Sequence, residues 1–330
     1  MSVQGNEHLP SSTSCHLGPN AVHGTSSNEA SLLAVSQQVI RDFLDRMNVT
    51  IPPYLPDLEV MSRVDKILQT WDFGDAIRPH VITALTITIT AYNHLTDIEA
   101  KVQIALFTAI TTALDVPAIM NSVSWRDLHT LFLPCSAENR SDLVRELRGI
   151  LVKMWDHYPP CSASAIFSSV LKFISATIFE NETKAIALSS DGAPFIEYRR
   201  AKGGLPEAYA YFIWEKAKFP DIKVYVQAIP HAMRYINYVN DILSFYKEEL
   251  EGETGNYIGD RGLVEGKSAL EVLREVIDET VGAAERVRRI LGEGEARDAW
   301  ENFVRGYTSF HISSPRYRLQ EVVGSRYLID

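Results

Sequence analysis

The sequence predicts an all-α protein built as a single helical bundle. From Ser31 onward nearly every segment carries apolar residues at helical spacing. Proline and glycine pairs such as Pro52-Pro53, Pro159-Pro160 and Gly203-Gly204 separate these segments. No internal repeat and no shift in composition divides the chain, so one domain over residues 30–330 is the economical prediction.

The expected helices follow a polar N-terminal stretch. Residues 1–29 are rich in Ser, Asn, Gly and His and lack apolar periodicity, so a disordered tail is expected there. "PDLEVMSRVDKILQTW" begins with Pro and an acidic residue, as helices often do. "SDLVRELRGILVKMW" has a Ser at the N-cap position, and "SALEVLREVIDETVGAAERVRRIL" has many charge pairs at spacings of three and four. These patterns favour amphipathic helices that pack along one face.

The segment from Pro79 to about Asp115 is the least clear. It includes "VITALTITITAYNHLTD", whose Thr-Ile alternation favours a strand by local propensity. A strand of that length would be abnormal, and no turn residue interrupts the run, so one continuous helix is predicted. Because this helix would be apolar nearly all round, we expect it in the centre of the bundle.

Composition excludes several classes of function. The formal net charge is −10, and nucleic-acid binding requires a basic face, so a nucleic-acid partner is not expected. Cys15, Cys135 and Cys161 form no CxxC pair and are predicted to be free thiols in a reducing compartment. The N-terminus is too polar for a secretory signal, and the longest apolar run, 163–179, is interrupted by Lys172 and serines. These features predict a cytoplasmic protein without a membrane span.

The stretch "NDILSFYKEE" (240–249) contains the most specific chemical pattern. Asn240, Ser244 and Glu248 are four residues apart, so their side chains lie along one stripe of a helix. An amide carbonyl, a hydroxyl and a carboxylate are the hard oxygen donors that Mg²⁺ prefers. In the N-terminal direction the same stripe is apolar through Met233 and Ile236, if the helix continues through Pro230. A solvated face would stay polar, so this change indicates an apolar cavity with a metal site at its mouth.

This stretch resembles the second metal-binding motif, N-D-x-x-S-x-x-x-E, of class I terpene cyclases, and "YVNDILSFYKEE" resembles the fungal trichodiene synthase family in particular. A second match supports the resemblance, because "GYTSFHISSPRYRLQEV" (306–322) is similar to the C-terminal Arg-Tyr segment of that family. The resemblance implies the class I terpenoid synthase fold, a single helical bundle around an apolar active-site cavity. It covers residues 31–330 and is sharp in these two segments.

The resemblance also implies an activity, a sesquiterpene cyclase that converts farnesyl diphosphate into a cyclic C15 hydrocarbon with Mg²⁺. Lys247, Arg316 and Tyr317 occupy the places of family residues that contact the diphosphate. Arg offers a planar fork of donors to phosphate, and Lys a point charge. In the alternative without a diphosphate site, Lys247 forms an ion pair with Glu251 one turn away, and Arg316 and Tyr317 are ordinary surface residues.

The cavity wall is expected to include aromatic residues, whose faces stabilise cations. "AYAYFIW" (208–214) supplies Tyr211 and Phe212 as candidate substrate contacts, with Tyr209 and Trp214 close in sequence. Ordinary core packing is the alternative for each of these residues.

Two departures from the family pattern affect the ionisation step. The counterpart of the family's aspartate-rich motif is assigned to "YNHLTDIE" (92–99), where Asn93 and Asp97 share a face and are predicted to help hold metal. His94 is expected to be a satisfied helix histidine, because Mg²⁺ prefers oxygen donors. At the position that corresponds to the family's diphosphate-sensing arginine, this sequence has Ser168. Lys172, one turn later, is the alternative source of positive charge.

These departures leave alternative functions open. A catalytically degenerate family member would bind a prenyl diphosphate or a partner without turnover. A prenyltransferase would need two aspartate-rich motifs, and neither is complete here, whereas a helical scaffold would show no Mg²⁺-dependent diphosphate binding. The altered first motif is reminiscent of fungal humulene synthases of tropolone meroterpenoid pathways, so humulene is the predicted product. A homodimer is expected by analogy with the family.

Overall fold

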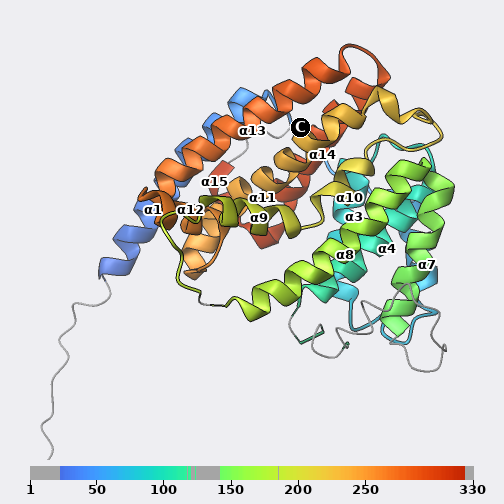
Figure 1. Cartoon of the computed structure of the whole chain (residues 1–330), viewed down its shortest axis with the longest axis horizontal. Coiled ribbons are helices and arrows are strands. Elements are labelled where there is room, and N and C mark those ends of the chain that lie inside the picture. Colours follow the sequence, from blue (N-terminus) through green and yellow to red (C-terminus); the bar gives the residue numbers. More distant parts are fainter. Residues whose placement is uncertain (1–22, 117, 120–122, 124–141, 185, 324–330) are drawn as a thin grey trace, which may run out of the picture.

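The computed structural model describes residues 23–116, 118–119, 123, 142–184 and 186–323 (Figure 1). These residues form helices joined by turns and loops, with no strand among them, which confirms the predicted all-α class. The α-helices are α1 (His23–Met47), α2 (Leu58–Leu68), α3 (Arg78–Ala91), α4 (Ile98–Leu114), α7 (Asp142–His157), α8 (Pro160–Glu182), α9 (Ala193–Lys202), α10 (Pro206–Tyr211), α11 (Ile229–Glu251), α12 (Tyr257–Glu265), α13 (Ala269–Leu291), α14 (Glu295–Ser313) and α15 (Gln320–Val323), with short 3₁₀ turns η3 (Ile222–Val224), η4 (Val226–Ala228) and η5 (Pro315–Tyr317).

The helices pack so that α3, α11 and α14 meet at the centre. α3 packs against α4 on one side and α14 on the other, while α11 packs against α10 and α13. In Figure 1, α1 and α13 run along one edge of the molecule, and α4, α7 and α8 lie at the opposite end. Gly306 of α14 permits the closest approach, because a Cβ there would lie 1.9 Å from the Thr90 carbonyl oxygen of α3.

The continuous helix predicted from Pro79 to Asp115 is wrong. The chain reverses at residues 92–97, which we call the α3–α4 turn, so α3 and α4 form an antiparallel hairpin. Asp97 ends the turn as the N-cap of α4, where its carboxylate accepts hydrogen bonds from the backbone N–H groups of Glu99 and Ala100. A turn can therefore form without Gly or Pro when an aspartate caps the next helix.

Two other boundaries also differ from the predictions. α1 begins at His23, inside the stretch expected to be a disordered tail through residue 29, while residues 1–22 lie outside the described part of the chain. Extending an existing helix avoids the cost of nucleation, so it needs no apolar periodicity. At α11, the helix does not continue through Pro230 toward the N-terminus, because Pro230 stands in its first turn, where its missing N–H costs nothing.

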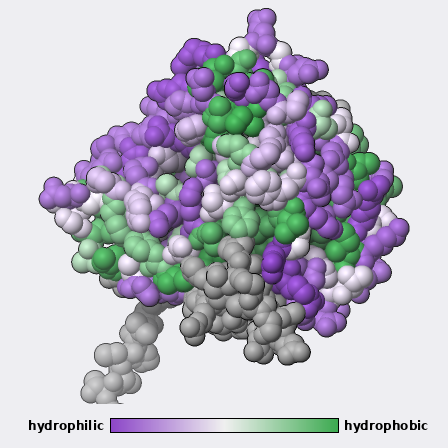
Figure 2. All heavy atoms as spheres, turned by 45° about the vertical axis from the view of Figure 1, so that its right-hand side comes forward, coloured by the Kyte–Doolittle hydropathy of each residue, from purple (hydrophilic) through white to green (hydrophobic). Residues whose placement is uncertain are grey.

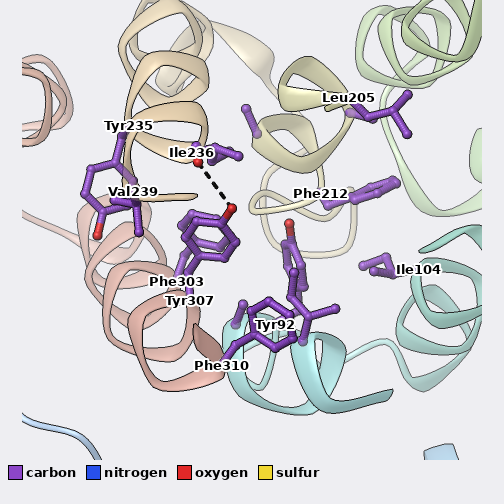
Figure 3. Close-up of a cluster of buried hydrophobic side chains, with 14 of the residues drawn as sticks. Tyr92, Ile104, Leu205, Phe212, Tyr235, Ile236, Val239, Phe303, Tyr307 and Phe310 are labelled. Atoms are coloured by element: carbon purple, nitrogen blue, oxygen red, sulfur yellow. Dashed lines mark hydrogen bonds between the residues drawn. The ribbon is translucent and has the colours of Figure 1, made fainter. Parts of the chain in front are cut away.

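The core is continuous and rich in aromatic side chains. Figure 3 shows Phe303, Tyr307 and Phe310 of α14 in one central cluster with Tyr92, and Phe212 on the opposite side. The Tyr307 hydroxyl donates a hydrogen bond to the Ile236 carbonyl of α11, at 3.2 Å. These contacts hold α14, α11 and the end of α3 in a fixed arrangement around the site described below.

The surface mixes hydrophilic areas with smaller hydrophobic ones (Figure 2). One described helix, α8, is long and apolar enough to cross a membrane by length and composition alone. Because 44% of its apolar window is buried inside the protein, α8 is readily explained as a packed helix of the bundle.

Candidate active site

A cavity of about 310 Å³, open to solvent at one side, lies between the central helices. α3 and α4 form one wall, α11 and α14 form the facing wall, and α8 and the α9–α10 segment close the sides. The lining residues discussed below are Thr83, Ile87, Thr108, Thr111, Thr112, Asp115, Phe173, Glu180, Arg200, Leu205, Tyr209, Ile236, Asn237, Asn240, Tyr307, Phe310, His311, Arg316 and Tyr317.

One end of the cavity carries the charged groups. Asp115, Glu180, Arg200 and Asn240 are shared with a second hollow that extends to Glu248. We call these four shared residues the mouth. Asp115 follows the last residue of α4, so the mouth lies at the end of the α3–α4 hairpin opposite to the α3–α4 turn. The apolar and aromatic residues of the lining, together with the charged mouth, form the kind of site that binds a chain with an anionic head group.

The predicted metal-binding stripe lies on α11 beside this mouth. Ser244 is buried, with 5% of its surface exposed, and its hydroxyl has no hydrogen-bond partner. Glu248, one turn further on, is half-buried and forms no ion pair within the described residues. Burial raises the pKa of Glu248, and the nearby carboxylate of Asp241 adds to that rise. The nearby Ser244 hydroxyl lowers the pKa of Glu248, although the two groups do not form a hydrogen bond of ordinary geometry.

Two aromatic residues orient the amide of Asn240. Its Nδ2 lies 3.4 Å from His311 Nε2 and 3.5 Å from the Tyr317 hydroxyl, so both contacts are long. His311 Nδ1 donates to the Tyr307 carbonyl at 2.8 Å, and burial lowers the pKa of His311 to about 4. The neutral ring therefore has Nε2 free to accept from the Asn240 amide, which leaves the Asn240 carbonyl oxygen available for a cation.

Arg200 at the end of α9 provides a largely buried cation, with 17% of its side chain exposed, next to the motif. Its Nε donates to Asp241 at 2.9 Å and its Nη2 to the Asn237 carbonyl at 2.8 Å. Burial alone would lower the pKa of Arg200, but the ion pair with Asp241 outweighs burial, and the pKa is raised. Asp241 thus anchors Arg200 to α11.

Arg316 and Asp115 line the same cavity as Asn240, Arg316 from η5, which packs against α11, and Asp115 from the end of α4. Arg316 is exposed in η5 and forms no ion pair within the described residues, whereas its neighbour Tyr317 is buried. Asp115 is reached by solvent, yet the packing around its carboxyl group raises its pKa, and nearby Arg316 and His80 oppose the rise. An acid and an unpaired guanidinium therefore face the same opening.

Lys247 has a different environment. Its Nζ forms an ion pair with Glu251 at 2.8 Å and a second one with Glu253, and the residue does not line the cavity. The structure therefore shows the local pairing that the helical spacing offered as an alternative. A diphosphate at the mouth would have to displace these carboxylates to reach Lys247.

Asn93 and Asp97 are not part of this site, which corrects the expected position of the first metal motif. Both lie at the α3–α4 turn, at the opposite end of the hairpin from Asp115. Asp97 caps α4 and bonds His157 Nδ1 at 2.7 Å. His94 Nε2 donates to the Ile213 carbonyl at 2.9 Å, but its buried Nδ1 has no hydrogen-bond partner, so the predicted satisfied helix histidine is only half satisfied and lies in the turn. Burial lowers the pKa of His94 to about 4.

Asn93 lines a larger hollow of about 640 Å³ that faces residues 50–58. Lys101 and Arg305 are among its other lining residues, but Asn240, Ser244 and Glu248 are not. Because its lining includes none of the motif donors, the larger volume does not identify this hollow as the active site.

The other expected contacts are placed as follows. The Ser168 hydroxyl bonds the Ala165 carbonyl, and Lys172 pairs with Glu207 at 2.6 Å, so neither lines the cavity. Arg200 is the buried cation at the mouth. Phe212 packs in the core against Tyr92, Phe107 and Tyr158, and Tyr211 is buried away from the lining, whereas Tyr209 does line the cavity.

The sequence contained signals for the residues that were missed. Asp115 ends the apolar run of α4, so it is the first acid where that buried helix reaches solvent. Arg200 belongs to "YRRAKGG", in which basic residues form the last turn of α9 just before the glycine pair that ends the helix. Neither signal identifies a site without the neighbouring helices.

Comparison with known proteins identifies the family. The sequence model described as "Trichodiene synthase (TRI5)" matches residues 76–327, which include the α11 motif and the Arg316-Tyr317 segment. The chain belongs to the trichodiene synthase family. It is similar to monoterpene synthase 25 of Postia placenta, with 48% identity over 92% of this chain and 91% of that protein. It also resembles terpene synthase 29 of the same fungus, with 47% identity over 87% and 84%.

A more distant relative is the alpha-cuprenene synthase COP6 of Coprinopsis cinerea, with 31% identity over 87% of this chain and 89% of that one. Membership establishes this chain as a terpene cyclase, a lyase with the all-α terpenoid synthase fold. The family acts on prenyl diphosphates and is generally metal-dependent.

The residues of this chain fit a hard divalent cation. Within the described residues, no three His, Cys, Asp or Glu side chains cluster as a metal site, but the α11 motif supplies an amide, a hydroxyl and one carboxylate instead. The Ser244 hydroxyl and the Glu248 carboxylate have no hydrogen-bond or ion-pair partner within the described residues, so their oxygens are available as metal ligands. Oxygen donors of this kind match Mg²⁺ better than softer metals.

Proposed function

We propose that this protein is a sesquiterpene cyclase that ionises farnesyl diphosphate with the help of Mg²⁺. The observation that carries the proposal is the unsatisfied Ser244 hydroxyl beside the unpaired Glu248, next to a cavity mouth with two guanidinium groups. A buried polar group without a partner costs free energy, so it is expected where a ligand completes it.

The metal would be held by Asn240, Ser244 and Glu248 on one side of the mouth, with Asp115 on the other. When bound, Mg²⁺ acts as a Lewis acid that polarises the diphosphate. Asp115 takes the role first assigned to Asn93 and Asp97. This choice is supported by its position on the cavity lining, opposite Asn240.

The protein groups have three tasks in this mechanism. Arg316, Arg200 and the Tyr317 hydroxyl would donate hydrogen bonds to the departing diphosphate and stabilise its charge. Lys247 could add a further positive charge after giving up Glu251 or Glu253. The buried walls exclude bulk water, and the rings of Phe173, Tyr307 and Phe310 would face the hydrocarbon cation.

A C10 substrate, geranyl diphosphate, is the second candidate. The relative with 48% identity is named a monoterpene synthase, and a cavity of about 310 Å³ suits a short chain. A degenerate protein that binds without turnover is less well supported, because such a protein would have no reason to keep donors unsatisfied at the mouth. Humulene as the product, a cytoplasmic location and a homodimer are further parts of the proposal that rest on the family resemblance.

The test is an incubation of purified protein with farnesyl or geranyl diphosphate, with and without Mg²⁺, followed by gas chromatography and mass spectrometry of the extract. We expect a C15 terpene that forms only with Mg²⁺. A C10 product alone would replace the substrate assignment. Binding of a non-hydrolysable analogue without any product would favour the degenerate protein.

A further inference from the structure

The wall of the cavity below the mouth is unusual for a site that handles a hydrocarbon. Thr108, Thr111 and Thr112 of α4 line it together with the phenol of Tyr209 from α10. Thr108 and Thr111 are each 2% exposed, and the Tyr209 hydroxyl donates to Thr108 Oγ1 at 3.3 Å. Apolar side chains would fill such a wall more cheaply, since buried hydroxyls need partners.

The protons of three of these four hydroxyls are already committed. Thr111 donates to the Phe107 carbonyl at 2.9 Å and Thr112 to the Thr108 carbonyl at 2.7 Å, while Tyr209 donates to Thr108. A hydroxyl has one proton and two lone pairs. The oxygens of Thr111, Thr112 and Tyr209 can therefore act only as acceptors toward the cavity.

A wall of hydrogen-bond acceptors favours a ligand that donates hydrogen bonds, such as a water molecule. A water molecule there would donate both hydrogens to protein oxygens, which turns its own lone pairs toward the middle of the cavity. Two or more polar partners and sufficient room are what a buried water requires, and the cavity supplies both. A water with its lone pairs turned inward is oriented as a nucleophile toward a carbocation.

The position along α4 determines which part of the substrate is reached. Thr111 and Thr108 precede Asp115 by four and seven residues, which at 1.5 Å per residue places them about 6 and 10 Å below the mouth. The diphosphate-bearing carbon, C1, would lie at the mouth itself. The wall therefore faces carbons further along the isoprenoid chain.

We propose that Thr111, Thr112 and Tyr209 hold a water molecule that captures the carbocation, so that the products include a terpene alcohol oxygenated at a carbon other than C1. This inference rests on the proposed function, because it needs the cation that diphosphate departure creates. The water lone pair forms the new C–O bond, and the proton that the resulting oxonium loses passes to the released diphosphate. No oxidant or reductant is required.

The experiment is turnover of farnesyl and geranyl diphosphate in H₂¹⁸O, with diphosphate release measured alongside the mass spectra of the products. We expect an alcohol that carries ¹⁸O at a carbon other than C1. Hydrolysis by a contaminating phosphatase breaks the P–O bond and yields a C1 alcohol with the substrate's ¹⁶O. Label and position together separate the two reactions.

Thr111→Val and Tyr209→Phe each remove one acceptor with almost no change in shape. We expect each variant to lower the ratio of alcohol to hydrocarbon by about fivefold, the equivalent of one ordinary hydrogen bond. The ratio is taken within each reaction, so a change in overall rate does not affect it. Thr86→Val is the matched control, because Thr86 makes the same type of backbone hydrogen bond, to Ile82 on α3, but does not line the cavity.

Three outcomes would overturn the inference. Diphosphate release with hydrocarbon as the only product would refute water capture and leave the cyclase intact. A labelled alcohol whose ratio to hydrocarbon stays the same in both variants would remove these residues from the reaction. No diphosphate release from either substrate would overturn the proposed function and this inference together.

Discussion

Asn240 and Ser244 on α11, and Asn93 and Asp97 at the α3–α4 turn, are both pairs of polar residues four apart at the end of an apolar stretch. Their surroundings differ. At the turn, Asp97 bonds His157 and the N-terminus of α4, and the buried Glu215 accepts from the backbone N–H groups of Thr96 and Asp97. On α11, the Ser244 hydroxyl has no partner.

This difference shows how to tell a structural polar cluster from a binding site. At the turn, the carboxylates of Asp97 and Glu215 find donors within the protein, so they stabilise a chain reversal and need no ligand. Beside the mouth, the Ser244 hydroxyl has no hydrogen-bond partner and the Glu248 carboxylate forms no ion pair within the described residues, which costs stability unless something binds. The first arrangement contributes to folding, and the second contributes to recognition.

The largest expected effect is on Glu248. Replacing its carboxylate with Glu248→Ala removes the one anionic donor of the α11 stripe, so turnover at saturating Mg²⁺ should fall by more than about a hundredfold. Diphosphate release measures this. Asp97→Asn is the matched control at the other end of the hairpin and should keep the rate within about twofold. Equal losses of turnover in Glu248→Ala and Asp97→Asn would show that the mouth and the α3–α4 turn do not differ in their role in catalysis.

A smaller effect, on stability alone, is expected at Glu215. This fully buried carboxylate accepts hydrogen bonds from Thr96 N–H, Thr96 Oγ1 and Asp97 N–H. Glu215→Gln replaces one acceptor oxygen with an NH₂ group that faces another donor, so the free energy of unfolding should fall by about 1–3 kcal/mol. Urea unfolding measures the loss. Activity per folded molecule should stay constant, and a selective loss of activity would mean that the turn takes part in catalysis.

The smallest effect concerns pH. Burial alone would raise the pKa of Asp97, but the hydrogen bonds from His157 and the Ala100 backbone outweigh burial and lower this pKa below its usual value. A carboxyl whose folded-state pKa is lowered stabilises the fold above its ordinary pKa, about 3.9, and this stabilisation disappears as the pH falls through the folded-state value. Asp97→Asn keeps an N-cap residue but loses the charge.

The Asn variant should therefore be less stable than the wild type at neutral pH, by about 1 kcal/mol, and the gap should close on acidification below pH about 4. Urea unfolding at a series of pH values measures both curves. A gap that stays constant with pH would show that the charge of Asp97 contributes nothing.

The local sequence predicted much of this protein because its signals are local. Helical periodicity identified the all-α class, and the spacing of Asn240, Ser244 and Glu248 identified one stripe of oxygen donors on α11. The same reasoning failed at residues 92–97, where an apolar run on both sides hid a chain reversal, and so it expected Asn93 and Asp97 to face the α11 stripe, although they lie at the end of the hairpin opposite to Asp115. Arg200 was missed because its partner, Asp241, is distant in sequence.

The sequence by itself therefore determined the helices and the chemistry of the donors, since backbone periodicity and side-chain type are properties of neighbouring residues. Only the tertiary structure decided which polar groups remain unpaired. Asp97 found His157, whereas Ser244 beside the mouth and Arg316 on the cavity lining remained without a hydrogen-bond or ion-pair partner within the described residues. The physical reason is that pairing depends on which helices meet in space, and a residue's own segment does not specify what it will face.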